Sequence, residues 1–202
     1  MPTNARARLM ATAERLFYEE GVRAVGVERI LREAGVGRAS LYRHFPGKDD
    51  LLVAVLTERD RNWRAWLAAR VGASDLEPAE LPLALFDGLH ERFAAMGFRG
   101  CAFINTMVEE ADPDSPAHGV AADHKERVIT YLDGLLRDCG YRSHEVLSRQ
   151  LALLADGAIV TALREGTPDA ALRARGIAAA LLGAADREET RQEREEDAPA
   201  RM

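Results

Sequence analysis

Apolar residues recur at helical spacing along almost the whole chain, and no other feature of the sequence constrains the fold as strongly. Leu9, Ala13 and Leu16, for example, lie at positions i, i+4 and i+7, which places them on one face of a helix. No stretch shows the sustained two-residue alternation of β-branched residues that marks a strand. The sequence therefore predicts an all-α protein of about nine helices.

Glycine and proline residues divide this pattern into segments, because both residue types end helices. Gly21, Gly35 and Gly140 are expected stops, and Pro116 is expected to open a helix that Ser115 caps. A loop is expected between the fourth and fifth helices. After a first helix that ends before Gly21, the expected helices span about Val27–Ala34, Arg38–Phe45, Lys48–Val71, Leu85–Phe93, Cys101–Glu110, Pro116–Cys139, His144–Glu165 and Pro168–Ala185.

The charge of the chain is unevenly distributed. The whole sequence carries 27 basic and 33 acidic residues, a formal net charge of −6. Residues 1–50 hold nine of the basic and seven of the acidic residues, a balance of +2, and the rest of the chain holds 18 and 26, a balance of −8. The sequence therefore predicts a basic domain at 1–50, an acidic helical domain at 51–185 and a charged, disordered tail at 186–202.

Two short helical segments joined by a tight turn lie in the basic part. Val27–Ala34 and Arg38–Phe45 flank Gly35-Val36-Gly37, and the preceding helix is placed to brace them. This is the pattern of a helix-turn-helix, whose second helix enters the major groove of DNA. Leu41 and Phe45, one helical turn apart, are expected to anchor that second helix to the core.

The same segment closely resembles the tetracycline-repressor (TetR) family. The family pattern, AGV followed by a short helix ending in LYxHFxxKxxL, is present in full between Ala34 and Leu51. The resemblance covers about residues 5–55 and implies a DNA-binding regulator. One position departs from it: the family usually has Thr-Ser before the first of the two helices, where this chain has Val25-Gly26. Glycine caps a helix but lacks the hydroxyl for the phosphate contact.

The DNA contacts are expected on the second helix and just after it. Arg38, at the helix start, is placed to bond a guanine through two hydrogen bonds. The resemblance implies that Tyr42 and His44 contact phosphate and sugar, and Lys48 is expected to meet a phosphate. Tyr42 as a core aromatic, His44 as a cap and Arg43 as a solvated charge are the alternatives. The predicted set is Arg38, Ala39, Ser40, Tyr42, Arg43, His44 and Lys48.

One helix-turn-helix offers too small a contact for tight specific binding, so a homodimer on a two-fold symmetric operator is expected. The last two helices carry apolar and small residues at helical spacing, which suits a four-helix interface between two copies. Packing of both stripes inside one chain is the alternative. The predicted interface residues are Leu147, Leu151, Leu154, Ala158, Leu172, Gly176 and Ala180.

The resemblance also implies a pocket for a small-molecule effector in the helical body. The apolar bias of that region predicts a lipophilic or aromatic effector, and a plain core role is the alternative for each residue. The predicted lining consists of Trp63, Trp66, Phe86, His90, Phe93, Phe103, Asn105 and Met107.

Other kinds of site are not indicated. Cys101 and Cys139 form no disulfide framework, and ordinary thiols are favoured over a redox switch. His118, Asp123 and His124 lack the spacing of metal ligands. With no nucleophile–base set, we expect no catalytic residues, metal or cofactor, and no enzyme. Without an apolar run of about 18 residues or a secretory signal, a cytoplasmic protein that spans no membrane is expected.

These features together predict a homodimeric repressor that binds a palindromic operator and is released from it by a small effector. The alternative is an all-α ligand-binding or scaffolding dimer that does not bind DNA, and the missing Thr-Ser pair is its only support.

Overall fold

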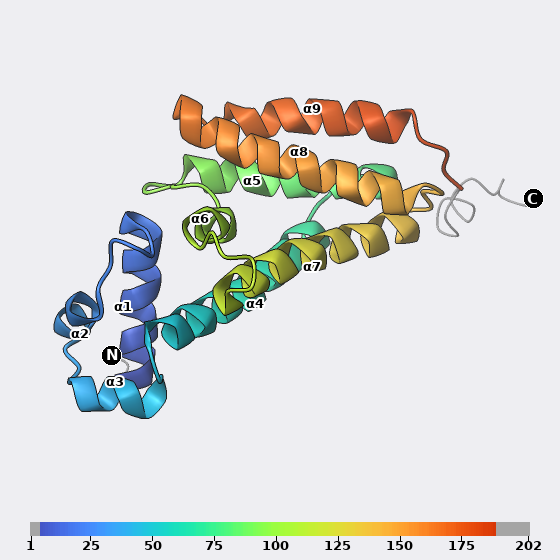
Figure 1. Cartoon of the computed structure of the whole chain (residues 1–202). Helices are drawn as coiled ribbons and strands as arrows, with labels where there is room; N and C mark the ends of the chain where they lie inside the picture. Colours follow the sequence, from blue (N-terminus) through green and yellow to red (C-terminus); the bar gives the residue numbers. More distant parts are fainter. Residues whose placement is uncertain (1–4, 189–202) are drawn as a thin grey trace, which may run out of the picture. The chain divides into compact units, whose positions relative to one another are not determined.

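The computed structural model of the protein describes residues 5–188 (Figure 1). This part of the chain forms nine α-helices and one 3-10 helix and contains no β-strand, so the all-α fold is confirmed. The elements are α1 (Ala5–Glu20), α2 (Val27–Ala34), α3 (Arg38–His44), α4 (Lys48–Gly72), η1 (Pro78–Leu83), α5 (Ala84–Ala94), α6 (Ala102–Glu109), α7 (Pro116–Asp138), α8 (His144–Glu165) and α9 (Asp169–Gly183).

The helix bounds differ from the expected ones at a few places. Pro78–Leu83 forms η1 where the sequence predicts a loop, and Pro78 can open it because a first helical residue needs no N–H partner. Phe45 lies just beyond α3 in an extended conformation, with φ −140° and ψ 119°. Ser115 sits at the start of α7 as expected, with its Oγ 3.5 Å from the backbone nitrogen of His118.

The chain divides into two compact units, and α4 and α7 each contribute to both. The first unit holds the residues up to Ala65 together with Arg99–Lys125. The second unit holds Trp66–Phe98 together with the residues from Glu126 on. The helix-turn-helix segment and α6 therefore belong to the same unit.

The first unit is built on the buried face of α1. Leu9, Ala13 and Leu16 are completely buried there. α2 and α3 both pack against α1, and they contribute Ile30 and Leu41 to the same hydrophobic core. Full burial of such an aliphatic side chain stabilises a fold by about 1.5–3 kcal/mol. The buried face of α1 therefore supports the two short helices, and Figure 1 shows α2 and α3 beside α1.

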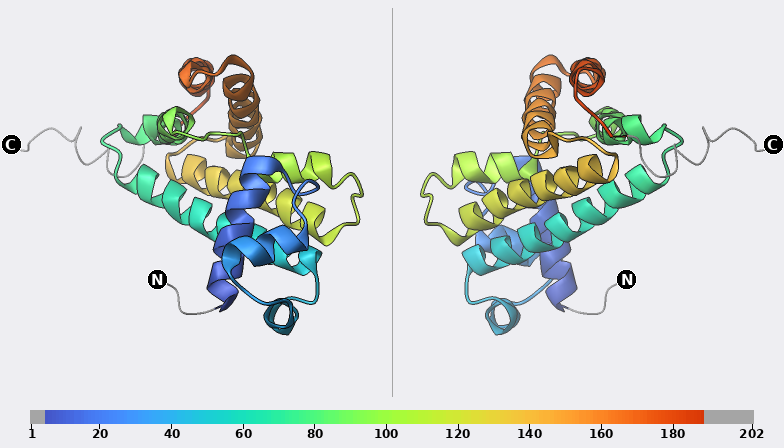
Figure 2. Two further views of the ribbon diagram at one scale, coloured as in Figure 1. Left: turned by 90° about the vertical axis from the view of Figure 1, so that its left-hand side faces the viewer. Right: turned by 90° about the vertical axis from the view of Figure 1, so that its right-hand side faces the viewer.

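In the second unit, α8 and α9 lie side by side, and α5 packs against both (Figure 2). Gly166 ends α8 in the left-handed conformation, with φ 68°, which allows the chain to turn back into α9. Ala171 and Ala178 are completely buried, and such small side chains allow close helix approach. Arg175 of α9 donates from Nε to Oδ1 of Asp87 on α5 at 2.7 Å, which ties these two helices together.

The beginning of the predicted tail is paired with the turn that follows α7. Arg187 and Tyr141 form an isolated antiparallel bridge, and the Glu188 N–H donates to the carbonyl of Gly140 at 2.9 Å. The remainder of the predicted disordered tail, 189–202, lies outside the described residues.

Candidate nucleic-acid interface

Two glycines set the turn between α2 and α3. Gly35 has left-handed backbone angles, φ 62° and ψ 39°, and the N–H of Val36 donates to the carbonyl of Leu31 at 3.1 Å. Gly37 is extended, and its carbonyl accepts from the N–H of Ser40 at 2.9 Å. Because glycine alone adopts φ near +60° without strain, Gly35 sets the direction in which α3 leaves α2.

Gly35→Ala is expected to lower the free energy of unfolding by about 1–2 kcal/mol, because a Cβ atom strains the left-handed conformation. Space is not the obstacle, since the added Cβ would lie 3.6 Å from a guanidinium nitrogen of Arg8. Gly72→Ala is the matched control, because a Cβ at Gly72 meets no atom within 4 Å, and it should not lower stability. Urea unfolding followed by circular dichroism measures both, and equal losses would contradict the role of the turn.

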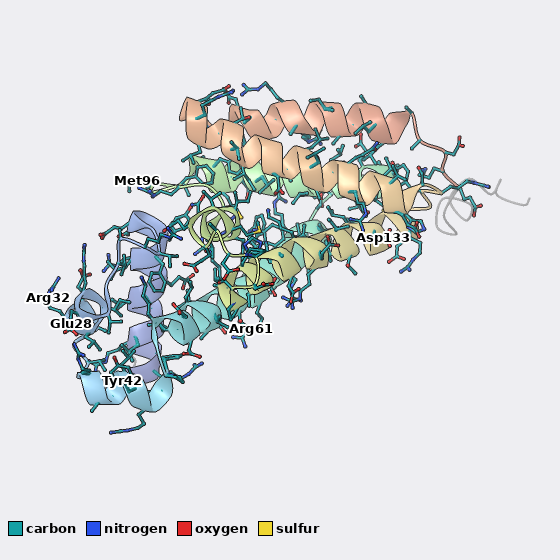
Figure 3. The ribbon with its side chains drawn as sticks, in the orientation of Figure 1. Glu28, Arg32, Tyr42, Arg61, Met96 and Asp133 are labelled. Atoms are coloured by element: carbon teal, nitrogen blue, oxygen red, sulfur yellow. The ribbon has the colours of Figure 1, made fainter. Side chains whose placement is uncertain are left out.

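α3 turns an apolar side to the core and a polar side to solvent. Leu41 and Phe45 are buried, as the helical spacing predicts. The remaining residues of α3 divide into the exposed Arg38, Ala39, Tyr42 and Arg43 and the half-buried Ser40 and His44. The polar side of α3 is therefore exposed rather than covered by other residues of the first unit, so it can contact a DNA duplex. Figure 3 labels Tyr42 on α3.

Tyr42 is not a core aromatic, because 51% of its surface is exposed. The His44 ring instead lies tilted against Phe45, with 6.4 Å between the ring centroids. The guanidinium of Arg6 lies 5.4 Å from the centroid of the same Phe45 ring. The start of α1 therefore adds a cation at the end of α3, which the sequence pattern did not reveal.

Lys48, a predicted phosphate contact, has a structural role in the described chain. Its ammonium donates to the carbonyl of Val22 at 2.6 Å and lies 5.9 Å from the ring centroid of Phe17. The start of α4 is thereby tied to the end of α1 and the loop that follows it. Because an ammonium has three donors, this contact leaves Lys48 the capacity to bind a phosphate as well.

Gly26 caps α2 with its backbone alone. It is extended, with φ −85° and ψ 155°, and its carbonyl accepts from the N–H groups of Arg29 and Ile30 at 3.1 and 3.3 Å. The neighbouring Val25 is completely buried. The exchange of the family's Thr-Ser for Val25-Gly26 therefore preserves the helix start and removes only the hydroxyl.

Ion pairs join α1 and α2 on the surface beside the turn. Arg29 donates from Nε to Glu33 at 2.8 Å and from a terminal nitrogen to Glu20 at 2.5 Å, and Arg15 pairs with Glu33 and Glu19. Hydrogen bonds from Arg29 and Arg15 hold the pKa of the Glu33 carboxyl below its usual range. Because these pairs are exposed, they contribute little to the free energy of unfolding. Their role is to favour one orientation of α2 relative to α1.

A further exposed pair reaches the recognition helix itself. The guanidinium of Arg38, at the start of α3, pairs with the carboxylate of Glu28 in the first turn of α2. The two residues are ten positions apart, and no spacing rule signals such a contact. The side chain predicted to read a base is thus held by a carboxylate on the neighbouring helix.

α6 is bound to α1 and to the loop after it. The carboxylate of Glu109 accepts from the backbone N–H of Arg23 at 2.8 Å. The hydroxyl of Tyr18 donates to the carbonyl of Gly100 at 3.1 Å and accepts from the N–H of Arg99 at 2.9 Å. These hydrogen bonds therefore couple the position of α6 and the segment before it to α1 and the loop that leads into α2.

A buried ionisable cluster connects α4 with α7 inside the first unit. Asp60 and His124 are each 2% exposed, and Nδ1 of His124 lies 2.8 Å from Oδ1 of Asp60. Arg64 donates from Nε to the same carboxylate at 3.1 Å. The ring of Phe103 stacks on His124 at 3.6 Å between centroids, and Trp63 meets His124 edge-on at 5.1 Å. Burial alone would raise the pKa of Asp60, but the hydrogen bonds from His124 and Arg64 hold it below its usual range.

The residues predicted to line an effector pocket fall into both units. In the first, Trp63 and Phe103 surround His124, and Asn105 lines a small pocket between α1, α4 and α6. In the second, Phe86 is completely buried, and Trp66 lies beneath the guanidinium of Arg92 at 4.6 Å. The others are Met107, which packs on the first core, the half-buried His90, and Phe93, which contacts Phe98.

The residues predicted for a dimer interface also divide, by burial. Those buried within the chain are Leu147, Leu151 and Ala158; Leu154 is half-buried; and those exposed are Leu172, Gly176 and Ala180. The buried three face their own chain and offer no surface to a second copy. Exposed apolar residues that the spacing did not single out lie on the same two helices, namely Val146, Leu153, Val160, Leu163 and Ile177.

α8 is the one helix of the described chain that is long and apolar enough to cross a membrane by length and composition, although the sequence predicts none. This observation is weak, because the core helix of a soluble protein passes the same test. Cys101 is half-buried and Cys139 buried, and neither forms a disulfide. Within residues 5–188 no three His, Cys, Asp or Glu side chains are grouped to hold a metal ion.

Comparison with known proteins agrees with this geometry. The family model described as bacterial regulatory proteins, tetR family, matches residues 9–55. An HTH-type transcriptional regulator of Staphylococcus aureus is 46% identical over 57 residues, which cover 28% of this chain and 30% of that relative. The chain thus matches less than a third of the length of this curated relative.

Two solved structures are similar over nearly the whole chain. A TetR-family transcriptional regulator from Streptomyces coelicolor is 37% identical, with a TM-score of 0.81, over 89% of this chain and 94% of that one. A putative TetR transcriptional regulator from Streptomyces avermitilis is 31% identical, with a TM-score of 0.80, over 92% and 100% of the two chains. With the helix-turn-helix, the exposed α3 and this similarity, the chain belongs to the TetR family of transcriptional regulators.

Proposed function

We propose that the protein is a homodimeric repressor that acts in the cytoplasm, binds a two-fold symmetric operator and is released from it by a small lipophilic or aromatic effector. The observation that carries the DNA-binding part is the exposed polar side of α3, with Arg38, Tyr42 and Arg43 facing solvent above the buried anchors Leu41 and Phe45. A helix anchored and exposed in this way can enter a major groove without rearranging its core.

The exposed apolar residues of α8 and α9 support the homodimer. We call this surface the α8–α9 outer face, and it comprises Val146, Leu153, Gly157, Val160, Leu163, Leu172, Gly176, Ile177, Ala180 and Gly183. The three glycines of this face meet no atom of their own chain within 4 Å of an added Cβ, so another helix has room to approach closely. An extended apolar surface of this kind marks a protein interface. Leu172, Gly176 and Ala180 remain in the proposed interface, whereas Leu147, Leu151 and Ala158 leave it.

The contacts of α6 support release by an effector. Glu109 and Tyr18 tie α6 and the segment before it to α1, which carries the helix-turn-helix. An effector that stabilises a second position of α6 would change the spacing of the two recognition helices in a dimer. The operator affinity would then fall by at most the ratio of the effector's affinities for the two states.

In vitro selection from a random duplex library with the full chain tests the proposal. The expected result is enrichment of a two-fold symmetric sequence, whose affinity falls steeply with salt because phosphate contacts release counterions. Lipophilic and aromatic compounds that raise the melting temperature should then weaken binding to that sequence. A protein that enriches no sequence is instead a ligand-binding or scaffolding member of the family.

Arg38→Ala is expected to relax the sequence preference at one guanine by about 1–3 kcal/mol, because the bidentate contact is lost. Arg43→Ala removes the same charge from another exposed position of α3 and serves as the matched control. It should weaken binding to all duplexes alike and reduce the salt slope by about one, as a phosphate contact would. Repeating the selection with each variant measures both effects. An unchanged preference in the Arg38 variant would remove Arg38 from the base-reading set.

A further inference from the structure

The ion pair between Arg38 and Glu28 joins the first turns of the two helices of the DNA-binding motif. Arg38 is the first residue of α3, and Glu28 lies in the first turn of α2 (Figure 3 labels Glu28). Their side chains are 62% and 67% exposed, so the pair stands in solvent on the surface of the motif. Within residues 5–188 neither side chain has another hydrogen-bond partner.

The position of Arg38 makes this pairing informative. A cation at the start of a helix lies beside the positive end of the helix dipole, which disfavours it. α3 has no acidic residue in its own first turn to offset that charge. Glu28 supplies the missing carboxylate from α2, where its own place in the first turn is favourable. The arrangement therefore stabilises one orientation of the guanidinium in the free protein.

The same carboxylate competes with DNA for that guanidinium. A phosphate offers Arg38 one exposed ionic contact of the same kind as the pair with Glu28, so exchanging the two gains little. A guanine accepts two parallel hydrogen bonds from the guanidinium at O6 and N7, inside the major groove and away from bulk water. A phosphate can also accept from a guanidinium in this way, but on the exposed backbone, where water and salt screen the contact. In addition, Glu28 is close to any duplex that Arg38 reaches, and its charge repels the phosphates of that duplex.

We propose that Glu28 is a specificity-determining residue, which holds Arg38 in an ion pair and releases it to a guanine of the operator but not to the phosphates of other DNA. This inference rests on the proposed function, because it requires a protein that recognises a sequence. By this inference, the acidic side chain of Glu28 on α2 suppresses binding to non-operator DNA.

The experiment compares two duplexes of equal length, the sequence selected by the wild-type full chain and a scrambled version of it. Fluorescence anisotropy measures the affinity of wild type, Glu28→Gln, Arg38→Ala and the double variant at several salt concentrations. Glu58→Gln is the matched control, because Glu58 pairs with Arg61 on α4 in the same unit and its loss changes the net charge equally. Circular dichroism verifies that each variant is folded.

Glu28→Gln is expected to tighten binding to the scrambled duplex roughly threefold to tenfold and to steepen its salt slope by about one, because Arg38 becomes free to meet a phosphate. Affinity for the selected duplex should change less, so the ratio of the two affinities falls. In the Arg38→Ala background the effect of Glu28→Gln should shrink to that of Glu58→Gln, which shows that the two residues act as a pair.

Three results would overturn the inference. Equal tightening on both duplexes would mean simple charge repulsion, and no change on either would mean that the pair has no effect on binding. Weaker binding to the selected duplex with a changed base preference would make Glu28 a base reader in its own right, accepting from a cytosine amino group. A wild-type chain that selects no sequence refutes the proposed function itself, and that result precedes the comparison of variants.

Discussion

Asp60→Ala is expected to lower the free energy of unfolding by about 3 kcal/mol, at the lower end of the range for a broken buried ion pair. The change removes the carboxylate that accepts from His124 at 2.8 Å and from Arg64 at 3.1 Å. His124 is 2% exposed, so its Nδ1 would lose the hydrogen bond to Asp60 while shielded from water. Arg64 is 43% exposed and can turn to solvent, which keeps the loss moderate.

The second unit contains a matched control for this change. Nδ1 of His144 lies 2.7 Å from Oδ1 of Asp133, in a pair whose side chains are 24% and 28% exposed. Asp133→Ala breaks the same type of contact where water can replace it, so it should cost at most about 1 kcal/mol. Urea unfolding of the three proteins gives the comparison. Equal losses in the two variants would show that the burial of Asp60 is unimportant.

The effect of Asp60→Ala should depend on pH. Because the pKa of Asp60 is lower in the folded chain than in the unfolded one, its carboxylate stabilises the fold above the unfolded pKa. That contribution is lost as the pH falls from the unfolded value of about 4 through the folded pKa. The difference in stability between wild type and variant should therefore shrink between about pH 5 and pH 3. A difference that stays constant over this range would contradict the lowered pKa.

Leu153→Glu is expected to convert the proposed dimer into monomers, with its dissociation constant raised by about a hundredfold or more. Leu153 lies on the α8–α9 outer face and is 74% exposed in the single chain, so a charge there costs the monomer little. In the proposed dimer the same charge would be buried among apolar side chains without a partner. Operator binding should be lost in parallel, because one helix-turn-helix reaches only one half-site.

Met96→Glu is the control for Leu153→Glu. Met96 is fully exposed on the loop between α5 and α6, outside the α8–α9 outer face, so the same charge there should leave the assembly unchanged (Figure 3). Sedimentation equilibrium of the full chain measures the molar mass of wild type and both variants. If the Leu153→Glu protein has the same molar mass in solution as wild type, the α8–α9 outer face is not the dimer interface.

The helix-turn-helix was predictable because its determinants are local. The positive φ of Gly35, the i, i+4 spacing of Leu41 and Phe45 and the stripe on α1 involve residues within one or two helical turns. Tyr42 shows the limit of this reasoning. Its residue type allows both a core and a surface position, and only the packed structure, with 51% of its surface exposed, distinguishes them.

Contacts between distant segments were not predictable from spacing. Asp60 and His124 are 64 positions apart, and each alone has the sequence environment of an ordinary charged helix residue. Spacing also gave no sign that the ammonium of Lys48 donates to the carbonyl of Val22, or that Arg38 pairs with Glu28. Such contacts depend on how helices pack, which the pattern along one helix does not encode.

The division between sequence and tertiary structure is clearest on α8 and α9. The sequence by itself determined that these are helices and that they carry apolar and small side chains over much of their surface. Only the tertiary structure decided that Leu147 and Leu151 face the core while Leu153 and Val160 face outward. The physical reason is that a helix face buried against its own chain and one buried against a second copy need the same apolar residue types. Periodicity therefore shows that a face will be covered. Only the packing of the folded chain shows which faces it covers itself.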